Sequence, residues 1–271
     1  MKKLFSLAFN SFKEVVRQPF YYILLFSGCF ILFMSFMFTF FAFGEELRMV
    51  KDMAISTITL CGLLTGILSS SVLITNEFKR KTILALLCKP VTRVQIVLGK
   101  FFGIAAAVIV LIFLQATFLE VLIKLDQVVG FSNLEPSLGM EGSSQLLDSY
   151  CLQGIYFSLL QVLMLTSISV ILSVYLNVSA NLITCFAVFI LSHIISYLFT
   201  LIEKAPVAVN FVVKICYVVF PNFWSLNIFA MNSISNEYVP LYIFYASLYS
   251  VLYCIIVLWL ATFCFERKEF Y

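Results

Sequence analysis

Residues 77–103, EFKRKTILALLCKPVTRVQIVLGKFFG, separate two strongly apolar segments and carry a large share of the positive charge of the chain. Six of the seventeen lysines and arginines lie in this stretch: Lys79, Arg80, Lys81, Lys89, Arg93 and Lys100. Connections between membrane spans that are rich in Lys and Arg lie on the cytoplasmic side. The stretch therefore predicts a cytoplasmic insert between two membrane-spanning helices, and we expect a soluble partner to bind there.

The composition of the whole chain agrees with a membrane location. Hydrophobic residues make up 62% of the sequence and charged residues only 11%, and 30 residues are Phe. Such a chain has too little polar surface to coat a soluble globule. We therefore expect an integral membrane protein, and the small net charge of +3 gives no reason to expect nucleic-acid binding.

Six apolar segments are long enough to cross a hydrocarbon core of about 30 Å as helices. They are residues 20–43, 53–74, 101–123, 151–176, 182–202 and 241–265. Alternation with a period of two, which marks a membrane β-barrel, is absent. The sequence predicts an all-α integral membrane protein with six transmembrane helices, in one domain over residues 1–271.

The basic residues are distributed unevenly between the two sides of this layout. Twelve of the seventeen fall in residues 1–19, residues 75–100 and the C-terminal tail, and five fall in the remaining connections. The positive-inside rule then puts both termini in the cytoplasm. We expect a multi-pass protein of the cell inner (cytoplasmic) membrane.

Residues 1–19 have the pattern of an amphipathic helix lying at the membrane surface. One side is apolar and the other carries charged and polar residues. The apolar stripe consists of Leu4, Phe5, Ala8, Phe9, Phe12, Val15 and Val16. Pro19 is expected to end this helix. The alternative is a simple extension of the first span.

Small residues mark the second and third spans. Gly62 and Gly66 are four residues apart and share one helix face, where two backbones can approach closely. The full set assigned to close packing is Gly62, Gly66, Ser69, Ser70, Gly99 and Gly103. Packing inside one subunit, a dimer contact and the lining of a pathway all remain open for this set.

The insert at residues 75–100 combines cations with apolar positions in a short helical pattern. A helix of this kind lies at the membrane edge and presents a surface to a partner. A basic loop that holds anionic lipid headgroups would have similar spacing. The residues alone leave these two interpretations open.

The run E-x-K-R-K-T-I-x-x-L-L-x-K-P-V-x-R and the closing GKFFG resemble the connection between the second and third helices of type-2 ABC exporter permeases. The preceding MVKDMAISTITLCGLLTGILSSSVLITNE and the later CYVVFPNFWSLNIF are also similar to that family. The closest resemblance is to the permease subgroup of copper-processing, nitrous-oxide-reductase-maturation transporters.

The resemblance implies a half-transporter that couples ATP hydrolysis on other chains to movement of a substrate. Its partners would be two copies of an ABC ATPase subunit, which hold ATP and Mg²⁺, and a second permease in a homodimer or heterodimer. Residues 75–100 would form the coupling region, with a coupling helix that docks on the ATPase. The matching positions are Glu77, Lys79, Arg80, Lys81, Thr82, Leu86, Lys89, Pro90 and Arg93.

The sequence offers little chemistry of its own. The phosphate-binding pattern G-x-x-x-x-G-K-[ST] is absent, and the eight cysteines show no C-x-x-C spacing, so we expect no cofactor, metal or catalytic residue and no enzyme activity in this chain. His193, the only histidine, is assigned to a possible polar pathway or to a structural hydrogen bond.

Residues 203–240 are expected to lie outside the membrane as a re-entrant or surface helix before the sixth span, because their apolar part is too short to cross. Two alternatives to an exporter stay open: a mechanical or assembly subunit of an envelope ABC complex, and a secondary carrier without an ATPase. The sequence does not identify a substrate.

Overall fold

The computed structural model describes residues 2–36, 46–79, 93–129, 149–201, 220–226 and 239–267. Within these ranges the chain forms helices and no strand, which confirms the all-α class. The elements are α1 (Lys2–Val16), α2 (Pro19–Ser35), α3 (Glu46–Lys79), α5 (Arg93–Val129), α6 (Ser149–Tyr175), α7 (Val178–Leu201), the short 3-10 helix η3 (Trp224–Leu226) and α10 (Val239–Arg267).

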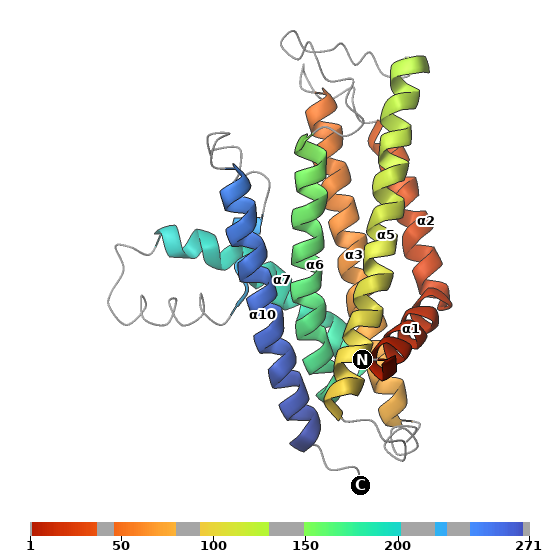
Figure 1. Ribbon diagram of the computed structural model, residues 1–271. Helices are drawn as coiled ribbons and strands as arrows, with labels where there is room; N and C mark the ends of the chain where they lie inside the picture. The colour runs from red at the N-terminus through yellow and green to blue at the C-terminus, as the bar shows by residue number, and fades with distance from the viewer. Residues whose placement is uncertain are drawn as a thin grey trace.

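Most of the long helices run side by side, whereas α1 and α7 do not (Figure 1). α2, α3, α5, α6 and α10 form an upright bundle, α1 lies at an angle to its lower end, and α7 crosses it obliquely. The last residue of α3, the first residue of α5 and the last residue of α10 all lie at the end where α1 lies, and we call this the α1 end. The start of α3 and the end of α5 lie at the opposite end.

Four described helices are long and apolar enough to cross a membrane. They are Met49–Thr75, Val94–Leu125, Cys151–Tyr175 and Val239–Phe265, and the bent pair Leu4–Val16 and Pro19–Ser35 makes a fifth if it counts as one span. The protein is thus a multi-pass membrane protein. The predicted first span, 20–43, begins as α2, and its part beyond Phe36 lies outside the described residues.

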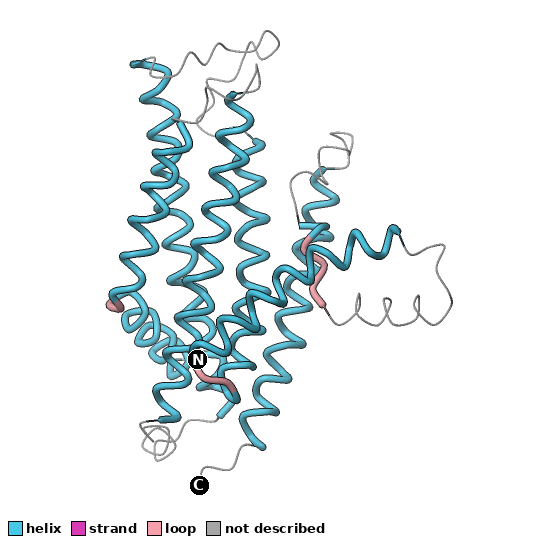
Figure 2. Tube along the Cα trace, turned by 180° about the vertical axis from the view of Figure 1, so that it is seen from behind, coloured by secondary structure: helices cyan, strands magenta, loops and turns pink. Residues whose placement is uncertain are grey.

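The predicted fifth span, 182–202, is helical as α7 but does not align with its neighbours. Figure 2, seen from behind, shows the same helix crossing the bundle at a slant. α7 also begins at Val178, four residues before the expected start, so only Leu176 and Asn177 separate α6 from α7. The layout with six transmembrane helices therefore stays a prediction.

The break between α1 and α2 follows from one proline. Pro19 occupies the first turn of α2, and Gln18 before it has extended backbone angles, φ −76° and ψ 138°. The residue before a proline is pushed out of the helical region by steric contact with the ring. The two helices meet at 64°, so α1 is a separate helix and not an extension of α2.

The centre of the bundle is α3, which contacts α2, α5, α6 and α7. Its side chains Ile58 and Ile67 are completely buried, and 72% of its most apolar window is covered by the rest of the chain. For α10 the covered share is only 28%. α3 is therefore the main packing element, and α10 lies at the periphery against α6 and α5.

The other sequence predictions are met only in part by the described ranges. α3 and α5 extend beyond the predicted spans, because the helices continue past the apolar segments into polar sequence. The expected coupling helix falls in residues 80–92, which lie outside the described residues. Of the expected re-entrant region, 203–240, the structure describes 220–226 with η3 and the start of α10.

Candidate functional site

The predicted coupling residues flank and fill the connection between α3 and α5. The backbones of Glu77 and Lys79 lie in the last turns of α3, and that of Arg93 begins α5. The other six lie outside the described residues: Arg80, Lys81, Thr82, Leu86, Lys89 and Pro90. The two helix ends that carry the connection lie at the α1 end (Figure 1).

Gly99 and Gly103 bring α5 into direct contact with α1. A Cβ atom on Gly103 would lie 2.5 Å from the carbonyl oxygen of Ala8, 2.6 Å from Cβ of Ser11 and 2.9 Å from the amide nitrogen of Phe12. A Cβ on Gly99 would lie 2.9 Å from Cβ of Leu7. The i, i+4 spacing of the two glycines permits this backbone contact within one chain.

This contact divides the apolar stripe of α1 into two parts. Ser11 and Val15 are buried on the side toward the bundle. Phe5 and Phe9 are 73% and 59% exposed. α1 therefore packs on α5 with one side and keeps apolar side chains exposed on another, as expected for a helix at the membrane surface.

Lys100 belongs to the inside of the bundle and not to the surface of the insert. Its side chain is only 7% exposed, and its Nζ donates a hydrogen bond to the carbonyl oxygen of Leu73 on α3 at 3.5 Å. A lysine near a helix end commonly buries its aliphatic part while its ammonium finds an oxygen. This bond joins α3 and α5 close to the coupling region.

Gly62 and Gly66 face other helices of the same chain. A Cβ on Gly62 would lie 3.1 Å from Val162 of α6 and 3.3 Å from Ile112 of α5. A Cβ on Gly66 would lie 2.0 Å from the Thr166 methyl of α6. The structure thus brings this pair into intrachain packing, and a dimer contact or pathway at these residues stays a prediction.

Ser70 belongs to a buried polar cluster that joins three helices. It hydrogen-bonds to Ser169 of α6, and Nδ2 of Asn181 on α7 donates to Ser169 Oγ at 2.9 Å and to Ser71 Oγ at 2.7 Å. Oδ1 of Asn181 accepts from Sγ of Cys185 at 3.3 Å. This cluster fixes the start of α7 to α3 and α6. Ser69 is fully buried, and its hydroxyl has no hydrogen-bond partner among the described residues.

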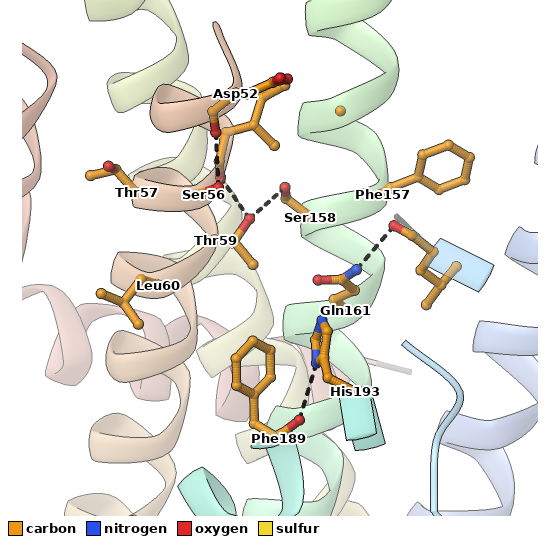
Figure 3. Close-up of a pocket in the computed structure, with 13 residues that line it drawn as sticks. Asp52, Ser56, Thr57, Thr59, Leu60, Phe157, Ser158, Gln161, Phe189 and His193 are labelled. Atoms are coloured by element: carbon orange, nitrogen blue, oxygen red, sulfur yellow. Dashed lines mark hydrogen bonds between the residues drawn. The ribbon is translucent and has the colours of Figure 1, made fainter. Parts of the chain in front are cut away.

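His193 lies beside a cavity of about 420 Å³ between α3, α6, α7 and η3 (Figure 3). Its Nδ1 is 3.1 Å from the carbonyl oxygen of Phe189, and its ring lies 4.7 Å from the Phe189 ring and 5.8 Å from the Phe223 ring. His193 thus makes a hydrogen bond within its own helix, and its structural role stays a prediction. It also lines the cavity, so the pathway role stays a prediction.

The segment 220–226 closes one side of this cavity and is held by side chains of two helices. Nε2 of Gln161 donates to the carbonyl oxygens of Phe223 and Leu226 at 3.4 and 3.0 Å. Tyr242 of α10 donates to the carbonyl oxygen of Ser225. Phe223 is completely buried. These bonds satisfy backbone carbonyls of a short segment, partly irregular and partly 3-10 helical, that packs against the membrane helices.

Sequence reasoning did not single out Asn181, Gln161 or Asp52 as site residues. Asn181 looks like a turn residue because it follows a helix end. A signal was available for the cavity wall, since Asp52, Ser56 and Thr59 repeat at helical spacing and so share a face of α3. The partners across the cavity, on α6 and α7, are not apparent from spacing.

Comparison with known proteins agrees with this architecture. A family model described as "ABC-2 family transporter protein" matches residues 37–270, which is most of the chain. No curated protein matches the chain. The chain belongs to the ABC-2 transporter family, and it is a membrane-spanning permease subunit of an ABC transporter.

Proposed function

We propose that this permease exports a substrate from the cytoplasm, using ATP hydrolysis on two separate ABC ATPase subunits that dock on residues 75–100. ABC-2 permeases usually work with an ATPase subunit and form dimers. In the proposal the α1 end faces the cytoplasm, the protein lies in the inner membrane, and a second permease completes the pathway. ATP and Mg²⁺ bind to the ATPase chains.

The observation that supports this proposal most is the position of the basic connection. The ends of α3 and α5 that flank it lie at the same end of the bundle as α1 and the end of α10 (Figure 1). In the sequence, twelve of the seventeen basic residues fall in residues 1–19, residues 75–100 and the C-terminal tail, the segments assigned to the cytoplasmic side. A soluble ATPase reaches only that side.

Packing at the α1 end supports transmission of movement from the connection into the membrane. The backbone contact of Gly99 and Gly103 with α1, and the Lys100 bond to Leu73, tie α5 to α1 and α3. Close-packed helices transmit displacement because they have little free space to absorb it. A push on the start of α5 therefore moves α1 and α3 as well.

Co-purification tests the docking site. A tagged full-length protein is purified from native membranes, and ABC ATPase subunits are quantified by mass spectrometry. The variant Lys79→Ala, Arg80→Ala, Lys81→Ala, Leu86→Ala is expected to lose at least about tenfold of the bound ATPase while it still inserts into the membrane. A tenfold loss corresponds to about 1.4 kcal/mol of binding free energy.

The matched control is Lys124→Ala, Lys204→Ala, Lys214→Ala, which removes three cations from connections assigned to the other side. It should retain the ATPase. Full retention by the first variant would contradict the docking proposal. The direction of transport is tested in inside-out vesicles, where export predicts ATP-dependent accumulation of cell-extract components, and accumulation only in right-side-out vesicles would contradict it.

The resemblance to permeases of copper-processing transporters stays a prediction, and no substrate is assigned from it. Transport into vesicles also separates an exporter from a mechanical or assembly subunit, since the latter would consume ATP without accumulating any component.

A further inference from the structure

We propose that α1 binds acidic phospholipids, with its exposed apolar side in the acyl chains and with Lys13 and Arg17 at the headgroup phosphates. α1 meets α2 at 64°, which is closer to perpendicular than to parallel. Because α2 stands upright in the bundle, α1 runs mostly along the membrane surface (Figure 1). A surface helix need not distinguish one lipid from another, so the placement of its cations decides the preference. The proposal depends on neither the ATPase nor the direction of transport.

The packing of α1 on α5 fixes which of its sides can reach lipid. Ser11 and Val15 are buried toward the bundle. The backbone of α1 at Ala8 lies directly on Gly99 and Gly103, so that a Cβ on Gly103 would lie 2.5 Å from the Ala8 carbonyl oxygen. α1 cannot turn about its own axis without losing this contact. The sides that face away from α5 therefore keep one direction with respect to the membrane.

The exposed apolar side and the cations of α1 lie next to each other. Phe5 and Phe9 are 73% and 59% exposed. Lys13 and Arg17 are exposed as well. At about 100° per residue, Lys13 lies about 40° around the helix from Phe9, and Arg17 about 80°. Lys13 lies about 160° from the buried Val15. The two cations thus border the exposed apolar side, away from the bundle.

The charge of α1 and its end favours an anion at this border. Residues 2–17 contain three lysines and one arginine, against the single carboxylate of Glu14. Glu14 lies about 140° around the helix from Phe9, which is farther than either Lys13 or Arg17. Each basic residue near an acidic membrane surface strengthens binding by about fivefold. The part of α1 that borders its apolar side is therefore positively charged.

An acidic phospholipid complements both features at once. Exposed phenylalanines are stabilised among acyl chains, and long Lys and Arg side chains reach from the edge of an apolar side to the headgroups. Phosphatidylcholine balances its phosphate with its own choline, whereas phosphatidylglycerol keeps a net negative charge. An acidic protein surface would match the cations alone. The geometry of α1 therefore favours phosphatidylglycerol over phosphatidylcholine.

Quenching by brominated lipids measures this preference at α1 itself. The reporter is Phe9→Trp in a Trp224→Phe, Trp259→Phe background, which leaves one tryptophan in the full chain and keeps an aromatic ring at the membrane surface. The full chain is reconstituted in equimolar vesicles of the two lipids, in which either phosphatidylglycerol or phosphatidylcholine carries the bromine. We expect phosphatidylglycerol to bind beside position 9 at least fivefold more tightly than phosphatidylcholine.

Trp259 provides the matched control position. In the Trp224→Phe protein it is the remaining tryptophan, and it is 68% exposed on α10. Residues 239–266 contain no lysine or arginine. The binding of the two lipids beside Trp259 should therefore differ by less than twofold.

Variants of the position-9 reporter then assign the preference to the two cations. Lys13→Gln, Arg17→Gln should reduce the preference to less than twofold. The matched control is Lys13→Arg, Arg17→Lys, which keeps both charges and should preserve it. Salt at 1 M should also reduce the preference, because the screening length falls to about 3 Å.

Three outcomes would overturn the proposal: equal binding of the two lipids beside position 9, a preference that is unchanged in Lys13→Gln, Arg17→Gln, or no quenching at position 9 while Trp259 is quenched. The last result would mean that water or protein covers this side of α1. The comparison of two lipids on one reporter protein needs no cation variant to fold. A failure of ATPase docking would leave these quenching results unaffected.

Discussion

The two ends of the bundle are built from different contacts. At the α1 end, glycine backbones of α5 lie directly on α1, and the buried Asn181 cluster joins α3, α6 and α7. Toward the other end, a cavity lies between α3 and α7, and side-chain hydrogen bonds from Gln161 and Tyr242 hold the short segment 220–226. The described residues at the α1 end make backbone-to-backbone contact, whereas those toward the other end line a cavity of about 420 Å³.

One chain can in this way combine a tightly packed end with a more open one. Tightly packed helices transmit displacement, whereas a region held by individual hydrogen bonds changes shape at low cost. The α1 end is therefore suited to receive force, and the region around the cavity is suited to change shape. Substitutions at the two ends should differ accordingly.

The largest effect is expected for Gly103→Ala. Its new methyl group would overlap backbone atoms of Ala8 and Phe12, which cannot rotate away. We expect the free energy of unfolding to fall by about 3 kcal/mol, which is the upper part of the range for overpacked sites. The matched control is Gly66→Ala, whose methyl would overlap the Thr166 side chain and touch that of Val108. Because these neighbours are side chains, we expect the free energy of unfolding to fall by only about 1 kcal/mol.

Both substitutions gain the same helix propensity, so their difference isolates packing. Melting is followed by fluorescence-detected size-exclusion chromatography. Equal melting temperatures for the two variants would contradict a specially tight contact between α1 and α5.

A smaller loss is expected for Asn181→Leu. The change removes the amide that donates to Ser71 and Ser169 at the α1 end. Each hydrogen bond between membrane helices contributes about 0.6 kcal/mol to stability on average. We therefore expect the free energy of unfolding to fall by about 1–2 kcal/mol. Hydrogen exchange should rise first at the start of α7. Ser27→Ala, whose hydroxyl bonds only Leu24 of its own helix, is the control and should show no change.

Gln161→Leu should act locally on the cavity side. The substitution removes the amide that donates to the carbonyl oxygens of Phe223 and Leu226. The free energy of unfolding should fall by about 1 kcal/mol. In a Trp259→Phe background, Trp224 is the remaining tryptophan and reports on the segment. Acrylamide quenching of Trp224 should increase, and it should stay unchanged in the control Gln153→Leu. Unchanged quenching in Gln161→Leu would mean that the segment is held by other contacts.

The smallest effect is expected for Ser56→Ala. The hydroxyl bonds only the Asp52 carbonyl of its own helix, four residues earlier, so stability should change by no more than about 0.5 kcal/mol. A fall of more than about 1 kcal/mol in the free energy of unfolding, measured in the same melting assay, would show that the cavity wall is packed as tightly as the α1 end.

The helical class and the amphipathic N-terminal helix could be predicted because both follow from local pattern. Long apolar segments predict membrane helices, and Pro19 predicts the break between α1 and α2. The tilt of α7 could not be predicted, because it depends on which neighbours Asn181 and Phe189 meet, and spacing along one helix carries no such information. The same holds for Gly99 and Gly103, where spacing predicts a close contact but not that α1 makes it.

The candidate functional site could also be predicted only in part. The basic connection stands out by charge, and His193 by being the only histidine. The cavity depends on three helices and a short segment distant in sequence, and on which side chains of these elements face one another. That information exists only once the helices are packed.

The central claim is that an ATPase transmits force through the connection between α3 and α5. Its most direct test is photo-crosslinking in the assembled transporter, with Leu86→benzoylphenylalanine in the connection and Met140→benzoylphenylalanine in a segment assigned to the other side. If the ATPase docks on residues 75–100, position 86 gives an adduct of this chain with an ABC ATPase subunit and position 140 gives none. Adducts with lipid alone from position 86, or an ATPase adduct from position 140, would contradict it.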